Sequence, residues 1–186
     1  MRHAIRTFAM LLASIGMLRA ADLENHSNWK DILNDRLPYY GHRNWIVIAD
    51  SAYPAQSRVG IETVVSGAGQ NEVIQYVLHV LASAKHVRPN IFLDRELEYV
   101  PEADAPGIDA YRTQLKALLA GREVGRLPHE QIISKLDAAG QTFRVLIIKT
   151  NLTVPYTSVF LQLDCAYWSA EAEQRLRDSM AKKAGR

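Results

Sequence analysis

The sequence predicts an α/β domain whose mainly parallel sheet is flanked by helices. Two mostly apolar runs, residues 45–49 and 143–148, are rich in β-branched residues, as is typical of strands covered on both faces. Other segments, such as 71–84 and 109–119, repeat apolar residues at the spacing of one helix face. Strands that alternate with helices form parallel sheets, and 186 residues suit a single domain.

Turn and capping residues predict where the remaining elements begin and end. Ser27 is the expected cap of a first short helix, and Asp109 that of a later one. Pro128 suits the first turn of a helix that Gly140 is expected to stop. Residues 58–65 fit either a strand or an extended connection. Further strands are expected at 90–93 and 159–163, and a charged C-terminal helix at 170–184.

Composition excludes several functional classes. The first 20 residues carry three arginines and no acid, so the rest of the chain has 19 basic and 20 acidic residues, net −1. That balance argues against a nucleic-acid partner. Cys165 is the single cysteine, so neither an intrachain disulfide nor a cysteine zinc cluster is possible. No metal-ligand spacing such as His-x-x-x-His is present.

Residues 1–20 are typical of an export signal. Arg2 and Arg6 precede an apolar stretch, 8–18, that is too short for a standard membrane-spanning helix. Ala20-Ala21 offers a cleavage point, although Leu18 and Arg19 make it imperfect. We therefore expect a mature domain of residues 21–186 in the periplasm or outside the cell, with no stable membrane span after processing. An uncleaved N-terminal anchor and a misread start are the alternatives.

The strand at 45–49 lies between two polar side chains that suit acid/base chemistry. His42 precedes it, and Asp50 follows it at the carboxyl end, where ligands bind in open α/β sheets. Two later pieces also border apolar elements: Pro128-His129-Glu130-Gln131 and Pro155-Tyr156-Thr157-Ser158. Each has a plainer interpretation: a surface or capping histidine for His42, a turn former for Asp50, an exposed residue for His129 and a loop anchor for Tyr156.

Taken together and in this order, these pieces resemble the D-ribose pyranase / L-fucose mutarotase family of sugar-ring isomerases. The resemblance covers about residues 28–168. It rests on Gly41-His42 with Asp50-x-x-x-Pro54, on the His129 motif, and on the loop from Lys149-Thr150 to Pro155-Tyr156.

The resemblance implies a role for each residue. His42 matches the proton donor, and Asp50, His129 and Tyr156 match substrate-binding residues. Ser158 stands where the family has an asparagine, which puts one sugar contact in doubt. The family also implies ring-shaped homo-oligomers whose site is shared between neighbouring subunits. The export signal and the C-terminal helix are departures from the family.

The sequence therefore predicts an exported pyranase or mutarotase that acts on a small aldose such as ribose or fucose. Opening a sugar ring requires proton transfers that imidazole can perform near neutral pH, so no metal or other cofactor is expected. One alternative is a non-catalytic monosaccharide-binding protein on the same scaffold. Another is an interaction protein with a vestigial pocket, for which a filled, inaccessible cleft around His42 would be expected.

Overall fold

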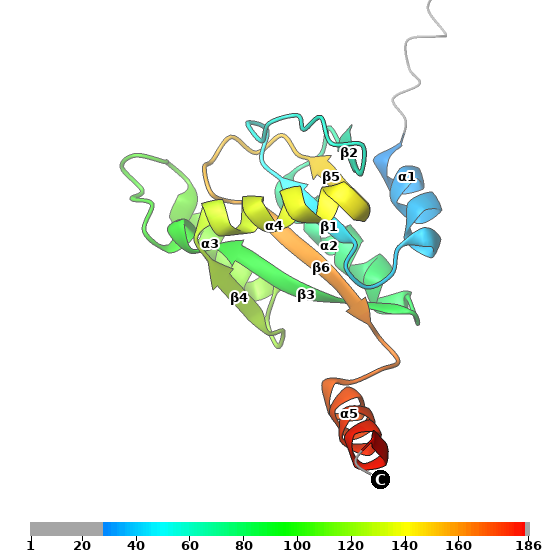
Figure 1. Cartoon of the computed structure of the whole chain (residues 1–186). Coiled ribbons are helices and arrows are strands. Elements are labelled where there is room, and N and C mark those ends of the chain that lie inside the picture. Colours follow the sequence, from blue (N-terminus) through cyan, green and yellow to red (C-terminus); the bar gives the residue numbers. More distant parts are fainter. Residues whose placement is uncertain (1–27, 185–186) are drawn as a thin grey trace, which may run out of the picture.

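The computed structural model describes residues 28–184, in which six strands form one sheet (Figure 1). The strands are β1 (Trp45–Ala49), β2 (Ile61–Val65), β3 (Val87–Asp94), β4 (Val124–Leu127), β5 (Val145–Lys149) and β6 (Val159–Cys165). The helices are α1 (Trp29–Arg36), α2 (Gln70–Ser83), α3 (Ile108–Leu118), α4 (His129–Thr142) and α5 (Ala170–Ala184), with 3-10 turns η1 (Leu37–Tyr39) and η2 (Arg95–Glu98).

The strand order is β2-β5-β1-β6-β3-β4, and only β6 runs against its neighbours. The expected α/β class with a mainly parallel sheet is therefore confirmed. The prediction that 45–49 is a buried, central strand is confirmed as well, because β1 is third in the order and all five of its residues are buried. Five strands consequently end at one edge of the sheet, the carboxyl edge, and β6 ends at the opposite, amino edge.

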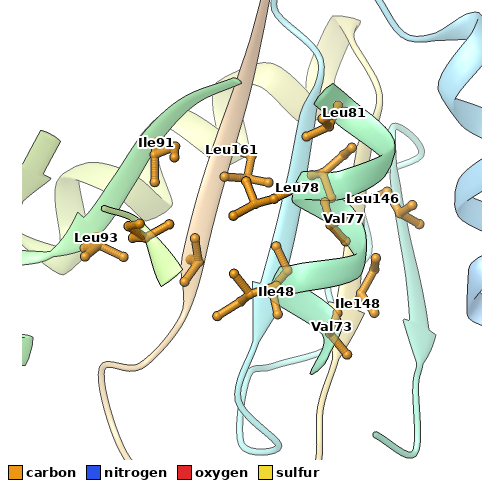
Figure 2. Packing of buried hydrophobic residues seen from close by; sticks show 14 of the residues in the cluster. Ile48, Val73, Val77, Leu78, Leu81, Ile91, Leu93, Leu146, Ile148 and Leu161 are labelled. Atoms are coloured by element: carbon orange, nitrogen blue, oxygen red, sulfur yellow. The ribbon is translucent and has the colours of Figure 1, made fainter. Parts of the chain in front are cut away.

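Helices cover both faces of the sheet. On one face α1, α2 and α3 pack against Ile46 and Ile48 of β1, and on the other α4 packs against Trp45, Val47 and Ala49. Successive side chains of a strand point to opposite faces, so a strand buried on both sides is apolar throughout. Figure 2 shows the first face, where Val73, Val77 and Leu81 of α2 lie over the sheet.

Two features of α4 and its approach differ from the expectations. β4 is not among the expected strands, because Val-Gly-Arg-Leu carries no long apolar run, yet it pairs with β3 in parallel. Gly140 does not stop α4 but lies within it. A Cβ there would sit 2.7 Å from Ile61 Cγ1, so glycine lets the helix lie close against β2.

Other boundaries differ by a few residues. Asn28 caps α1, its Oδ1 accepting the Lys30 N–H at 3.2 Å, while Ser27 lies outside the described residues. Gly107 precedes α3 with a φ of 94°, one residue before Ile108, so Asp109 lies in the first turn and is not the cap. β3 is longer than the expected 90–93.

The C-terminal helix α5 extends away from the sheet beyond the end of β6 (Figure 1). None of the helices within residues 28–184 is long and apolar enough to cross a membrane. The expected export signal, residues 1–20, lies outside the described residues.

Candidate functional site at the carboxyl edge of the sheet

Polar side chains gather where β1 and β3 end and β6 begins. Asp50 follows β1, Asp94 is the last residue of β3, and Ser158 directly precedes β6. β6 is antiparallel to both of these strands. Its first residue, Val159, therefore pairs with Ile48 and Leu93, which are the next-to-last residues of β1 and β3. The topology alone thus brings these three side chains to one edge, the place where α/β sheets bind ligands.

Asp50 is held by both carboxylate oxygens. Its Oδ1 accepts the backbone N–H of Ala52 at 2.9 Å, and its Oδ2 accepts the Ser158 hydroxyl at 3.1 Å. The expected turn-forming contact is therefore present, but it occupies one oxygen only. Ser158 is 2% exposed, so in this chain it contacts Asp50 from within the protein. A direct contact of Ser158 with sugar stays a prediction.

His129 begins α4, two residues after β4, and is fixed by acidic groups of another segment. Its backbone N–H donates to the Glu96 carboxylate, at 3.1 Å to Oε1 and 3.0 Å to Oε2. Glu96 thereby caps a helix whose own N-cap residue, Pro128, makes no side-chain cap. The ring Nδ1 lies 3.1 Å from Asp94 Oδ1. Backbone and ring are thus both anchored to residues 94–96, at the end of β3 and the start of η2.

Asp94 is the most buried charged group of the site, at 1% exposure. Burial raises its pKa from 3.8 to about 6, and nearby His129 opposes that rise. Its Oδ2 has no hydrogen-bond partner among the described residues. Leaving a buried carboxylate oxygen without a partner is costly, so such a group calls for an explanation beyond packing.

Tyr156 presents its ring to His129, with ring centroids 5.7 Å apart in an edge-on arrangement. Its φ is 57°, the left-handed region that a bulky side chain rarely adopts and that costs about 1–2 kcal/mol. The residue is 39% exposed. A partly exposed aromatic in a strained backbone beside a histidine suits a ligand contact better than a core role.

The loop that carries Tyr156 is held from behind by a buried hydrogen-bond network. The Thr157 carbonyl accepts both the Tyr111 hydroxyl at 2.6 Å and the Gln70 amide at 2.8 Å. Gln70 also accepts the Thr150 hydroxyl at 2.6 Å. These bonds tie both ends of the loop to α2 and α3, which explains how the strained Tyr156 backbone is maintained.

His42 lies at the opposite edge of the sheet. It is an exposed turn residue before β1, whereas Asp50 follows β1, and five strand residues at roughly 3.3 Å each place about 16 Å between the two ends. Asp50, His129, Tyr156 and Ser158 therefore come together within one chain, and His42 does not join them. Residues that flank a strand mark its two ends, so His42 and Asp50 cannot act as one pair within a chain.

The surroundings of His42 are open. A cavity of about 580 Å³ is lined by His42, Arg88, Asp164 and Trp168, among others, at the amino edge. A smaller cavity of about 390 Å³ lies beside the carboxyl-edge cluster, between Glu96 and Tyr156. No group of three or more His, Cys, Asp or Glu that could hold a metal ion occurs in residues 28–184.

The sequence does not mark Asp94 or Glu96 as site residues, although both carboxylates contact His129 in the structure. The available signal was position, because two carboxylates directly follow an apolar strand at the edge where Asp50 lies. Gln70 and Tyr111 were also missed, as helix residues with no local sign of a polar role.

The fold and this cluster define an α/β protein with an acid- and histidine-lined site at the carboxyl edge of its sheet. Residues 30–165 match the model of the RbsD / FucU transport protein family. The match spans well over half of the chain, so the protein belongs to that family. No curated protein sequence matches the chain.

Three solved structures are similar in fold. Bacillus subtilis RbsD complexed with D-ribose is 24% identical, covers 71% of this chain and 90% of its own, and has a TM-score of 0.49. FucU from Bifidobacterium longum is 21% identical, with coverage of 72% and 94% and a TM-score of 0.49. The fucose mutarotase of Streptococcus pneumoniae, in complex with L-fucose, is 20% identical, with coverage of 71% and 90% and a TM-score of 0.47.

Proposed function

We propose that this protein is a sugar-ring isomerase, a pyranase or mutarotase, that acts on a small aldose such as ribose or fucose. The observation that carries the proposal is the convergence of Asp50, His129 and Tyr156 at the carboxyl edge, in a chain that belongs to the RbsD / FucU family. Family membership supports sugar-ring interconversion or sugar binding, and the chemistry of these groups favours the first.

The groups of the cluster match what ring opening needs. The Asp50 carboxylate can accept hydrogen bonds from sugar hydroxyls, and the Tyr156 hydroxyl can donate or accept them. One proton must leave the anomeric hydroxyl and another must reach the ring oxygen. The cluster has a single imidazole, His129, for these two transfers. A second acid/base group is therefore needed, and His42 is the candidate.

His42 can reach the sugar only from another subunit. The two parts of the site lie at opposite edges of the sheet, so a head-to-tail contact would bring the amino edge of one subunit against the carboxyl edge of the next. Such heterologous contacts close into rings when the rotation allows. We therefore propose a homo-oligomer in which His42 protonates the ring oxygen of a sugar bound at the neighbour's cluster.

Saturation-transfer NMR tests the activity directly. We expect the protein to accelerate exchange between anomers or ring forms of at least one of ribose, fucose, galactose and glucose. Measured binding of a sugar without any acceleration of exchange would contradict the isomerase proposal.

Mixed oligomers test the shared site. Two inactive variants, His42→Ala and His129→Ala, should regain activity when co-expressed, because about one quarter of randomly assembled contacts would then pair an intact His42 with an intact cluster. The matched control is co-expression of Asp50→Ala with His129→Ala. Both changes lie in the same cluster, so this mixture should stay inactive; recovery there, or none in the first mixture, would contradict the arrangement.

A non-catalytic monosaccharide-binding protein is the second candidate. It is favoured by the distance of His42 from the cluster within one chain and by Ser158, whose hydroxyl is already bonded to Asp50. The exchange assay separates the two candidates. The interaction-protein alternative is not favoured, because His42 is exposed beside a cavity and the filled cleft that it requires is not found there.

Export remains part of the proposal. The basic and apolar pattern of residues 1–20 supports removal of a signal and a mature domain that begins near Ala21. Mass spectrometry of the protein from its native cell should give an N-terminus near Ala21 outside the cytoplasm. An intact Met1 on a cytoplasmic product would contradict export.

A further inference from the structure

The Asp94–His129 pair is not explained by sugar binding alone. Asp94 contacts His129 through Oδ1, is 1% exposed, and has a second oxygen without a partner among the described residues. A carboxylate that merely stabilised the fold would be expected to have both oxygens hydrogen-bonded. The pair also joins two segments 35 residues apart, the end of β3 and the start of α4.

The contact defines which ring nitrogen of His129 carries a proton. An ionised carboxylate can only accept hydrogen bonds, so Nδ1 must donate to Oδ1. In the neutral ring Nε2 is then an acceptor. No hydrogen bond of Nε2 to any of the described residues is formed, and the ring is partly exposed, at 32% of its side-chain area. Nε2 is therefore a free and partly exposed acceptor of the cluster.

The ring is also fixed in direction. Glu96 holds the His129 backbone N–H, Asp94 holds Nδ1, and the Tyr156 ring lies edge-on to the imidazole. Catalytic groups must be held close to their productive geometry by a rigid supporting shell. Three contacts from two segments, residues 94–96 and the loop that carries Tyr156, meet that requirement.

We propose that Asp94 is the positioning residue that makes His129 the general base of the ring-opening step. This inference rests on the proposed function and extends it, since it separates the roles of the two histidines. Nε2 takes the proton of the anomeric hydroxyl as the C1=O bond forms. The bond from C1 to the ring oxygen breaks, and its electron pair stays on that oxygen, which takes a proton from His42 of a neighbouring subunit. Ring closure reverses both transfers.

Asp94 contributes by stabilising the imidazolium that this step creates, in a site where its charge is little screened. It does not touch the sugar, because its side chain is buried. Glu96 and Asp50 are the other carboxylates near Asp94, and buried Tyr53 lies close enough to feel its charge. None of the three is hydrogen-bonded to the His129 ring, whose Nδ1 is bonded to Asp94.

The first test reads the tautomer without any sugar. Nitrogen-15 NMR of the histidine-labelled full chain, assigned with His129→Ala and recorded where the ring is neutral, should show His129 protonated at Nδ1 and bare at Nε2. An Nε2–H tautomer would overturn the proposal. This readout is independent of activity, so it can fail while the isomerase function holds.

The second test is a double-mutant cycle on sugar exchange. Asp94→Asn, an isosteric change, should lower kcat at least about tenfold with little change in KM, up to the roughly 10²–10⁴-fold effect of losing a general base. In a His129→Ala background the same change should have no further effect. Glu130→Gln, an exposed acid next to His129, is the matched control and should leave kcat unchanged.

The outcomes separate the two levels of inference. An unchanged kcat in Asp94→Asn, or an Asp94 effect that persists without His129, overturns the positioning role and leaves the isomerase standing. No accelerated exchange by the parent protein overturns the isomerase itself, and the general-base role with it, even if the Nδ1–H tautomer is found.

Discussion

The two edges of the sheet both carry a histidine and a carboxylate, yet they are built differently. At the carboxyl edge His129 is bonded to a buried carboxylate, and Asp50 is fixed through both oxygens. At the amino edge His42 is exposed and makes no side-chain hydrogen bond to the described residues, while Asp164 pairs with Arg88 on the surface. One edge is preorganised within the chain, and the other lacks the contacts that would orient its histidine.

The difference indicates which part of the site a single chain can complete. Binding groups need fixed geometry, and the carboxyl edge provides it from its own strands and loops. A proton donor that lies on an exposed turn becomes oriented only when a second surface meets it. The comparison thus supports an assembly in which the neighbour completes the amino edge.

The largest effect is expected from His42→Ala. If His42 is the proton donor, anomer exchange should fall about 10²–10⁴-fold. Sugar affinity should change little, because the cluster that we propose to bind the sugar lies at the other edge. Saturation-transfer NMR gives the exchange rate and calorimetry the affinity. Exchange at the parent rate would remove the amino edge from the mechanism.

Asp94→Asn should change how stability depends on pH. Burial raises the pKa of Asp94 from 3.8 to about 6, so the folded protein binds this proton more tightly than the unfolded chain does. The parent therefore loses stability relative to the neutral variant as pH rises from about 4 to about 6. The pKa of Asp94 differs by about two units between the unfolded and the folded protein. This difference corresponds to a change of about 3 kcal/mol in the free energy of unfolding.

The measurement is denaturant unfolding of parent and variant between pH 3.5 and 8. The free energy of unfolding of Asp94→Asn minus that of the parent should increase across this window and be flat on either side. A constant difference would mean that Asp94 does not titrate with a raised pKa. Ionising Asp94 would then not destabilise the folded protein, contrary to what its burial implies.

Tyr111→Phe should have an intermediate effect. It removes one of two hydrogen bonds to the Thr157 carbonyl, worth about 1 kcal/mol of unfolding free energy, since Gln70 still donates to that oxygen. The loop that carries Tyr156 should open more often, which would raise its amide hydrogen exchange and weaken sugar binding. Unchanged exchange in residues 152–158 would show that the network does not hold the loop.

The smallest effect is expected from Arg88→Ala at the amino edge. Arg88 and Asp164 are 47% and 38% exposed, and surface ion pairs of this kind contribute about 0–1 kcal/mol. Chemical denaturation of the protein should show a change in unfolding free energy within about 0.5 kcal/mol. A loss of several kcal/mol would mean that the amino edge is as tightly built as the carboxyl edge.

The sequence predicts the parts of the fold that have strong local patterns. β1 is recognisable because five buried residues in a row need cover on both faces, and Asp50 follows from its end. β4 is not recognisable, because Gly125 interrupts a run of four residues. Its glycine reflects packing instead, since a Cβ there would sit 2.8 Å from the Phe92 ring.

The candidate site also has residues that the sequence indicates and residues that it does not. Asp50, His129 and Tyr156 could be found from motifs, because each borders an apolar element. The pairing of Asp94 with His129 could not, since the two residues lie 35 positions apart in the chain. The position of His42 relative to Asp50 was open to sequence reasoning, because the length of β1 already separates them.

The last strand has a consequence for how the protein is made. β6 is the final strand of the chain, yet it lies in the middle of the sheet, between β1 and β3. Until residue 165 has left the ribosome, β2-β5-β1 and β3-β4 can form only as two separate sheets with open edges. Asp50 belongs to the first of these and Asp94 to the second. The nascent chain therefore acquires its sheet and its carboxyl-edge site in one late event, and chains cut short before β6 expose two strand edges prone to aggregation.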